Sequence, residues 1–290
     1  MTLQQTMREF RAGGTDLSER RRSGVSRGQI VELAPNGAMT SIVWSADGAA
    51  RIGALVTIET LATDARVQAA YPGLAAAAAG LATPQIRSVG TLGGNLAQRT
   101  RCWYFRNPHL SCLKKGAPIC PARAGNHLYG VAFDLGPCVA PHPSTLAVAL
   151  LAYEATVTTT VRPNLLVAAL LGDGADGTID NTLASGEAIT HIDMPAPRAE
   201  ERAGYRRAIS RAFAEWPLVE VVARAVIADQ RFAFVRVAAG GVAPVPLRFA
   251  DVEQALQGAA CDETKIREAA APSCGRRRGC ESFVEIVEML

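Results

Sequence analysis

Apolar and polar residues follow two kinds of spacing along this chain, and the sequence has no longer repeat. Short apolar or alternating runs predict β-strands at residues 29–33, 39–44, 50–52, 155–160 and 232–238. Runs with apolar residues on one helical face predict helices at residues 57–64, 71–83 and 217–228. Strands and helices mixed in this way indicate the α+β fold class.

Local signals support the three predicted helices. Thr57 followed by Thr60 gives part of a capping pattern at the start of the first helix. The second helix is dense in alanine, the strongest helix former. In the third, Pro217 stands near the start, where the missing N–H of proline costs least.

The composition is that of a folded protein with enough apolar residues for a large core. A length of 290 residues corresponds to about two domains; 49% of the residues are apolar and 20% are charged. A net charge of +3 is too small to indicate a nucleic-acid partner. The longest apolar runs, at residues 74–82 and 144–152, are shorter than the roughly 18 residues of a membrane span. Residues 1–20 are charged and lack an apolar signal core, so we expect a cytoplasmic protein.

Two glycine-rich segments have the composition of anion-binding loops. The first is Arg11-Ala-Gly-Gly-Thr-Asp16, and the second is Gln85-Ile-Arg-Ser-Val-Gly-Thr-Leu-Gly-Gly-Asn95. Glycines let a backbone turn tightly and expose its N–H groups, which then form a nest for phosphate oxygens. The first segment alone also fits an ordinary turn before a helix that has Asp16 in its first turn. Two such loops in one chain favour a diphosphate held between them.

Four of the seven cysteines, Cys102, Cys112, Cys120 and Cys138, lie within one arginine- and proline-rich stretch, residues 98–141. A long insertion of this kind is usually functional, and clustered cysteines suggest a shared ligand. The gaps of nine, seven and seventeen residues favour an iron–sulfur cluster over zinc, which is usually bound by closely spaced cysteine pairs. Buried free thiols remain an alternative; disulfides are a weaker one, because the cysteine number is odd and no secretion signal is visible.

The other reactive side chains show no catalytic spacing. The four histidines form no metal-binding pair and are interpreted as structural: His109, His127, His142 and His191. The three remaining cysteines are interpreted as core or incidental thiols: Cys261, Cys274 and Cys280.

With these motifs in their observed order, the sequence resembles the FAD-binding (medium) subunit of molybdenum hydroxylases. It looks most similar to the xanthine dehydrogenase and aldehyde oxidoreductase branch whose flavin subunit also carries a [4Fe-4S] cluster. The segment Ala12-Gly-Gly-Thr-Asp16 resembles the first phosphate loop of that family, and residues 86–96 resemble the second. The stretch that holds the four clustered cysteines resembles the cluster-bearing insertion.

The resemblance implies a fold and a domain arrangement. We expect a two-subdomain FAD-binding fold of the PCMH and vanillyl-alcohol-oxidase type over residues 1–187, with the iron–sulfur insertion at about 98–141. A smaller α+β domain is expected over residues 188–290, with an irregular tail at 272–290.

The resemblance also implies site residues. The first loop would contact FAD through Phe10, Arg11, Ala12, Gly13, Gly14, Thr15, Asp16, Leu17 and Ser18. The second loop would do so through Ser88, Gly90, Thr91, Gly93, Gly94 and Asn95. Two further positions are Thr145, where the family typically has an aspartate, and Arg207, where it often has a lysine. Cys102, Cys112, Cys120 and Cys138 would be the iron ligands.

By the same resemblance the chain is an oxidoreductase subunit that does not act on the organic substrate itself. A large molybdenum-cofactor subunit and a small [2Fe-2S] subunit would be its partners, in a heterotrimer or a dimer of heterotrimers. Electrons would pass through the flavin to an external acceptor. Export with a signal-bearing partner would make the complex periplasmic. The alternatives are a zinc-binding protein whose basic tail docks a partner, and a cofactor-free subunit with a role in assembly.

Overall fold

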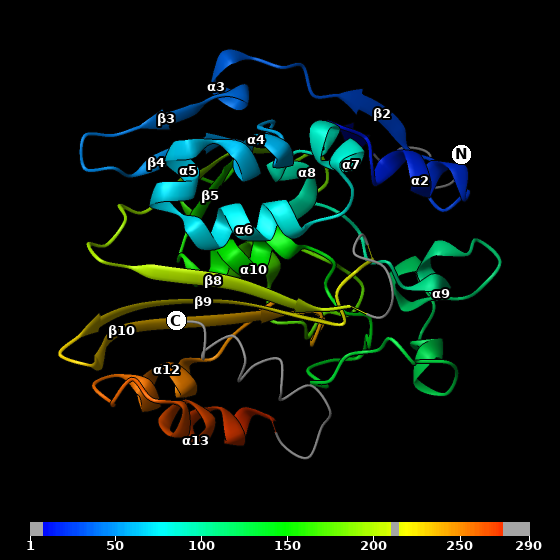
Figure 1. The fold of residues 1–290 in the computed structure, drawn as a ribbon. Helices are drawn as coiled ribbons and strands as arrows, with labels where there is room; N and C mark the ends of the chain where they lie inside the picture. Colours follow the sequence, from blue (N-terminus) through cyan, green and yellow to red (C-terminus); the bar gives the residue numbers. More distant parts are fainter. Residues whose placement is uncertain (1–7, 210–214, 275–290) are drawn as a thin grey trace.

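The computed structural model describes residues 8–209 and 215–274, and it stacks two sheets and their helices in layers (Figure 1). One sheet has five strands in the order β3-β4-β7-β5-β6, and every neighbouring pair is antiparallel. Its strands are β3 Ile42–Trp44, β4 Ala50–Gly53, β5 Thr156–Thr159, β6 Leu165–Leu166 and β7 Ile189–Met194. Because β7 pairs with both β4 and β5, this sheet continues past residue 187, where the sequence places the domain boundary.

The second sheet is also antiparallel and has the order β11-β10-β9-β8. Its strands are β8 Arg202–Ala208, β9 Val219–Ala228, β10 Arg231–Gly240 and β11 Leu247–Arg248. A separate parallel pair, β1 Arg8–Arg11 and β2 Gln29–Glu32, leads into and out of the first glycine loop.

Helices separate the two sheets and cover the outer face of the second one. The helices of the first domain are α2 Leu17–Arg22, α3 Gly37–Thr40, α4 Ile58–Thr63, α5 Ala65–Ala70, α6 Pro72–Gly80, α7 Pro84–Val89, α8 Leu92–Leu96, α10 Thr145–Ala152 and α11 Val167–Leu171. Of these helices, α6 and α10 lie on one face of the second sheet. Two later helices, α12 Ala250–Leu256 and α13 Glu263–Cys274, lie on its other face (Figure 1).

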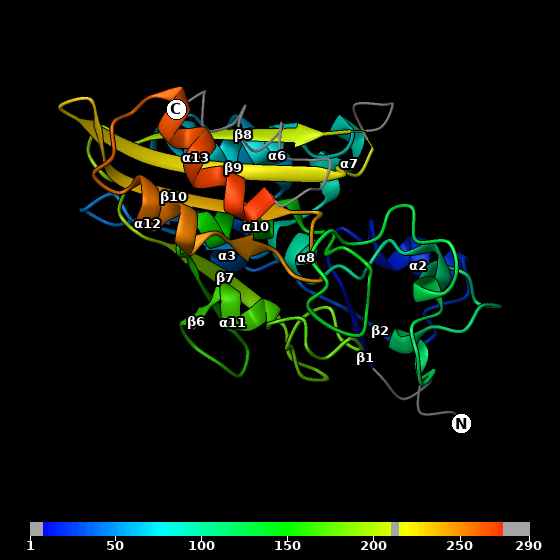
Figure 2. The ribbon, with the colours of Figure 1, turned by 90° about the horizontal axis from the view of Figure 1, so that it is seen from below.

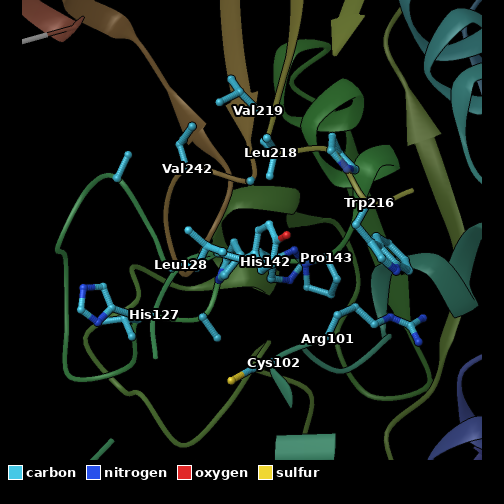
Figure 3. A pocket seen from close by; sticks show the side chains of 18 of the residues that line it. Arg101, Cys102, His127, Leu128, His142, Pro143, Trp216, Leu218, Val219 and Val242 are labelled. Atoms are coloured by element: carbon cyan, nitrogen blue, oxygen red, sulfur yellow. The ribbon is translucent and has the colours of Figure 1, made fainter. Parts of the chain in front are cut away.

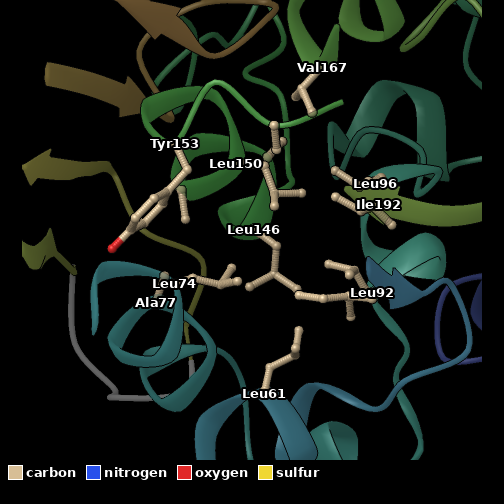
Figure 4. Packing of buried hydrophobic residues seen from close by; sticks show 14 of the residues in the cluster. Leu61, Leu74, Ala77, Leu92, Leu96, Leu146, Leu150, Tyr153, Val167 and Ile192 are labelled. Carbon is tan, nitrogen blue, oxygen red and sulfur yellow. The ribbon is translucent and has the colours of Figure 1, made fainter. Parts of the chain in front are cut away.

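The main core forms around α10, whose eight residues are all buried. A helix that is apolar on every side must be surrounded by other elements. Leucines from α4, α6 and α8 converge on it, together with Ile192 of β7 (Figure 4). The alanine-rich sequence of α6 lets that helix pack closely in the same layer.

The insertion lies to one side of the layers, next to α2 and the β1–β2 pair (Figure 2). Its regular elements are short: α9 Trp103–Arg106 and the 3₁₀ turns Leu113–Lys115 and Pro121–Arg123. The Lys115 side chain stabilises the segment 104–110 of the insertion. Its Nζ donates to the carbonyls of Tyr104, Asn107 and Leu110 at 3.0, 2.6 and 2.6 Å. In the described part of the chain, no helix has the length and apolarity to cross a membrane.

Most predicted elements are confirmed. The predicted strands at 29–33, 50–52, 155–160 and 232–238 correspond to β2, β4, β5 and β10. The predicted helices at 57–64 and 71–83 correspond to α4 and α6, and Thr57 caps α4 by accepting from the Thr60 amide at 3.1 Å. The run 39–44 is only partly a strand, since α3 ends at Thr40 and β3 begins at Ile42.

The predicted helix at 217–228 is wrong, because Val219–Ala228 forms the strand β9. This strand lies between β8 and β10, with helices over both faces of the sheet. A strand covered on both faces loses its polar alternation, so periodicity alone does not distinguish it from a buried helix. The β-branched residues in Val-Glu-Val-Val-Ala-Arg-Ala-Val-Ile were the signal for a strand.

A buried ion pair connects the second sheet to the helical layer. Arg224 on β9 donates to Glu201 through Nε at 2.8 Å and through Nη2 at 2.7 Å, and both side chains are buried. Its third nitrogen, Nη1, donates to the carbonyl of Ala152 at the end of α10 at 2.7 Å. The guanidinium also lies 4.0 Å from the ring centre of Tyr153.

Replacing Arg224 by Met leaves the Glu201 carboxylate buried without its cation. Loss of one partner of a buried pair costs about 3–5 kcal/mol of unfolding free energy. The matched control is Lys265→Met, which breaks an exposed pair with Glu268 and should leave the unfolding free energy nearly unchanged. Denaturant unfolding of both variants measures the difference; equal losses would contradict the role assigned to Arg224.

Candidate functional site

The two glycine loops are in direct backbone contact. A Cβ atom at Gly13 would clash with the carbonyl oxygen of Val89, which immediately precedes Gly90 of the second loop. Gly14 has a φ of +70°, a left-handed conformation that glycine adopts without strain. The two loops, with Gly13 and Val89 76 positions apart, therefore meet at Gly13, where no side chain fits.

The first loop presents unused donors. Within residues 8–209 and 215–274, the amides of Gly13, Gly14 and Thr15 have no hydrogen-bond acceptor. In the second loop, Thr91 caps α8 by accepting from the Gly94 amide at 3.2 Å, and Gly93 packs so closely that a Cβ there would lie 2.8 Å from the Cβ of Ala54. The first loop thus offers amides to a ligand, while the second provides a rigid wall.

A cavity of about 240 Å³ opens where the two loops meet. Eight of the residues assigned to the cofactor site line it: Thr15, Asp16, Gly90, Thr91, Gly94, Asn95, Thr145 and Arg207. The other nine lie outside its lining: Phe10, Arg11, Ala12, Gly13, Gly14, Leu17, Ser18, Ser88 and Gly93. Among those nine, Leu17 is buried in the core and Arg11 forms an ion pair with Glu32.

One lining residue, Asn95, also connects the second loop to α10. The side-chain oxygen of Asn95 accepts from the Ser144 hydroxyl at 2.7 Å and from the Leu146 amide at 3.2 Å. Ser144 caps α10 by accepting from the Ala147 amide. The second loop is therefore fixed to the central helix of the core.

A buried acid lies at the inner side of this region. Glu220 on β9 is 2% exposed, and it accepts from the Tyr205 hydroxyl at 2.9 Å and from the Thr145 hydroxyl. Burial raises the pKa of Glu220 to about 7, while the two hydroxyls and the charge of Arg207 act in the opposite direction.

A larger cavity, about 720 Å³, adjoins the first and shares four lining residues with it: Arg101, Glu215, Trp216 and Pro217. Its walls are mostly apolar and come from the insertion and from the second sheet, as the labelled Leu128, Leu218 and Val242 show (Figure 3). Cys102 lines the larger cavity (Figure 3), so the two adjoining cavities together extend from the glycine loops to the cysteine-bearing segment.

Arg101 lines both cavities and was assigned by sequence only to the insertion. Its guanidinium lies 4.5 Å from the ring centre of Trp216, in a cation–π geometry. Its Nε is buried and has no hydrogen-bond partner in the described part of the chain. Trp216 was not predicted as a site residue, and a tryptophan after the Ala-Glu pair gives no local signal of the contact.

The four clustered cysteines are all free thiols in the insertion; Cys112, Cys120 and Cys138 are buried and Cys102 is half-buried. Burial raises the pKa of Cys112, and it raises that of Cys138 to about 11, with Lys114 acting to lower the latter. Cys112 interacts electrostatically with Cys102 and Cys120, and Cys138 with Cys120, so the four form one neighbourhood. Among the described residues, no three histidines, cysteines or acids are arranged to hold a single metal ion.

His142 lines the larger cavity and is a structural residue, as expected. Its Nδ1 accepts from the Ser144 amide at 3.3 Å, and its Nε2 therefore carries the proton toward the Asp180 carbonyl at 3.1 Å. Burial lowers the pKa of His142 to about 4, so the ring is neutral near pH 7.

Two family models match this chain, one over each of its two sheets and their helices. The model described as the FAD binding domain in molybdopterin dehydrogenase matches residues 4–197. The one described as the CO dehydrogenase flavoprotein C-terminal domain matches residues 204–274. The chain belongs to the family of FAD-binding subunits of molybdopterin dehydrogenases, and the predicted fold class is confirmed.

Curated relatives include oxidoreductase subunits from Escherichia coli. The chain is 34% identical over 220 residues to the aldehyde oxidoreductase FAD-binding subunit PaoB of strain K12, covering 73% of this chain and 68% of the relative. It is 38% identical over 86 residues to the xanthine dehydrogenase FAD-binding subunit of strain O157:H7, a match that spans 29% of this chain and 30% of that protein.

Solved structures share the fold. CO dehydrogenase from Hydrogenophaga pseudoflava matches with a TM-score of 0.71 and 20% identity, over 97% of this chain and 87% of that chain. Quinoline 2-oxidoreductase from Pseudomonas putida 86 matches with a TM-score of 0.69 and 18% identity, with the same coverage.

Glu220→Gln tests the buried acid through the pH dependence of stability. Below pH 4.5 the carboxyl is protonated in both the folded and the unfolded chain. As pH rises to about 7 the unfolded chain releases the proton while the folded protein retains it, so the wild type loses unfolding free energy over this window. The loss relative to Glu220→Gln is about 3 kcal/mol. Urea unfolding at several pH values across this window measures the loss. If the unfolding free energies of the two proteins change in parallel with pH, the pKa of Glu220 is not raised.

Proposed function

We propose that this chain is the FAD- and [4Fe-4S]-binding electron-transfer subunit of a molybdenum-containing hydroxylase of the aldehyde oxidoreductase or xanthine dehydrogenase type. The observation that carries the proposal is the backbone contact between the two glycine loops beside a cavity lined by both. Family membership and the similarity to PaoB support the flavin part. The four neighbouring thiols of the insertion support the cluster part.

The residues of the site fit FAD. The free amides of Gly13, Gly14 and Thr15 are donors for diphosphate oxygens. Of these residues Thr15 lines the smaller cavity, where Arg101 and Arg207 supply positive charge. Ligand pockets measure about 300–1,000 Å³, which exceeds the first cavity and matches the two adjoining cavities together. The larger cavity has the apolar walls and the Trp216 ring that suit an aromatic ring system.

The residues of the insertion fit a [4Fe-4S] cluster better than zinc. A zinc ion holds its sulfur ligands about 2.3 Å from one point, whereas a cluster binds its four cysteines at four separate irons. The four thiols share one neighbourhood, and their gaps of nine, seven and seventeen residues are unlike the closely spaced cysteine pairs of most zinc sites. Lys114 favours the charged form of the Cys138 sulfur, which iron binding requires.

In this role the protein supplies binding and electrostatics, and the cofactors supply the redox chemistry. When bound, FAD would convert between one-electron and two-electron transfer, and the cluster would carry single electrons. The partners would be a large molybdenum-cofactor subunit and a small [2Fe-2S] subunit, in a heterotrimer or a dimer of heterotrimers. The chain would work in the cytoplasm, or in the periplasm after export with a signal-bearing partner.

Anaerobic purification followed by a visible spectrum tests both cofactors. We expect flavin bands together with a broad brown iron–sulfur absorbance. Cys112→Ser should remove the broad absorbance and leave the flavin bands, since Cys112 lies in the insertion and outside both cavities. The matched control is Cys261→Ser, a thiol outside the insertion, which should leave the whole spectrum unchanged. A colourless protein that contains zinc would contradict the proposal.

Gly13→Ala tests the contact between the loops. The added methyl clashes with the Val89 carbonyl and separates the loops, so FAD should bind at least about tenfold more weakly, equivalent to about 1.4 kcal/mol. The control is Gly37→Ala, since a Cβ at Gly37 meets no other atom. Titration of FAD fluorescence gives both dissociation constants. Equal affinities in the two variants would mean that FAD does not use this contact.

A further inference from the structure

Two acidic residues, Asp16 in the first loop and Glu19 in α2, form ion pairs with arginines of the cysteine-bearing segment. Asp16 Oδ1 accepts from Arg106 Nη2 at 2.7 Å and pairs with Arg101 Nη2 at 3.1 Å. Glu19 Oε2 pairs with Arg101 Nη1 at 3.3 Å and with Arg106 Nη1. The second oxygen of Asp16 accepts from Arg20 Nε at 2.9 Å and from the amide of Arg99 at 3.3 Å.

Asp16 and Arg106 form the least exposed pair of this group. Their side chains are 13% and 10% exposed, against 42% for Glu19. Burial acts to raise the pKa of Asp16, but Arg101, Arg106 and Arg20 outweigh it and hold the pKa below its usual value. Asp16 is therefore ionised at neutral pH, and both of its oxygens are already bonded within the protein.

Arg106 also forms hydrogen bonds with the backbone around Cys102. Its Nε donates to the Thr100 carbonyl and its Nη2 to the Arg99 carbonyl, both at 2.8 Å. Its own amide donates to the Cys102 carbonyl at 2.9 Å, closing the turn of α9. Arg106, whose side chain Asp16 binds, is thus hydrogen-bonded both to the backbone before Cys102 and to Cys102 itself.

We propose that Asp16 is a positioning residue: through Arg106 and Arg101 it fixes the Cys102 segment against the first glycine loop and does not itself contact the cofactor. The sequence resemblance had assigned Asp16 to FAD. This inference rests on the proposed function for the identity of the two ligands, but the contact itself exists in the protein without them. In this role Asp16 joins the proposed FAD site at the first glycine loop to the proposed cluster site at Cys102.

Amide hydrogen exchange on the chain without FAD, iron or sulfide tests the contact. In Asp16→Asn, the amides of Arg106 and Asn107, which bond to the Cys102 and Trp103 carbonyls, should exchange about tenfold faster than in the wild type. The control is Glu187→Gln, which also replaces a buried carboxylate bound by an arginine, Arg162, at a site outside both cavities. It should leave the exchange of these two amides unchanged.

A second set of variants separates positioning from general destabilisation. Arg106→Gln should speed the same exchange, and combining it with Asp16→Asn should add little, because both changes break one interaction. In the reconstituted protein, a chelator should bleach the broad absorbance of Asp16→Asn faster than that of Glu187→Gln.

Unchanged exchange in Asp16→Asn, or fully additive effects in the double variant, would overturn the proposal. A loss of FAD affinity of tenfold or more without faster exchange would show that Asp16 contacts FAD. Because the exchange is measured on the cofactor-free chain, faster exchange in a protein that never binds FAD or iron would refute the proposed function and leave this contact in place.

Discussion

The close approach of two glycine loops is the constraint on which the rest of the site depends. Gly13 and Val89 touch through their backbones, and any side chain at Gly13 would separate them. The second loop is fixed in turn by Asn95, which bonds to the cap of the central helix α10. The packing of the core thus sets the position of the loops, and the first loop leaves the Thr15 amide free at the cavity.

Charge then connects this cavity to the cysteine-bearing segment. The insertion has little regular structure, so side chains rather than sheet or helix hydrogen bonds determine where it lies. Lys115 organises it internally through three backbone carbonyls, and Arg101 and Arg106 attach it to the first loop. Such pairs are worth more when they are half-buried and shared among several groups than when they are isolated on the surface.

Features encoded in short stretches could be predicted from the sequence; those made by distant contacts could not. The Thr57 cap and each glycine motif involve residues only a few positions apart, so a local sequence pattern is enough to identify them. The strand β9 was mistaken for a helix because the sheet is covered on both faces. Arg101 and Trp216 are 115 positions apart, and Glu220 bonds to Thr145, 75 positions before it, so no local pattern predicts either contact.

The most direct measurement is a crystal structure of the chain reconstituted with FAD. The account predicts the diphosphate between the two loops, with its oxygens within hydrogen-bond distance of the Gly13, Gly14 or Thr15 amides, and the aromatic ring in the larger cavity beside Trp216. A diphosphate bound elsewhere on the protein, with these amides still unoccupied, would contradict it.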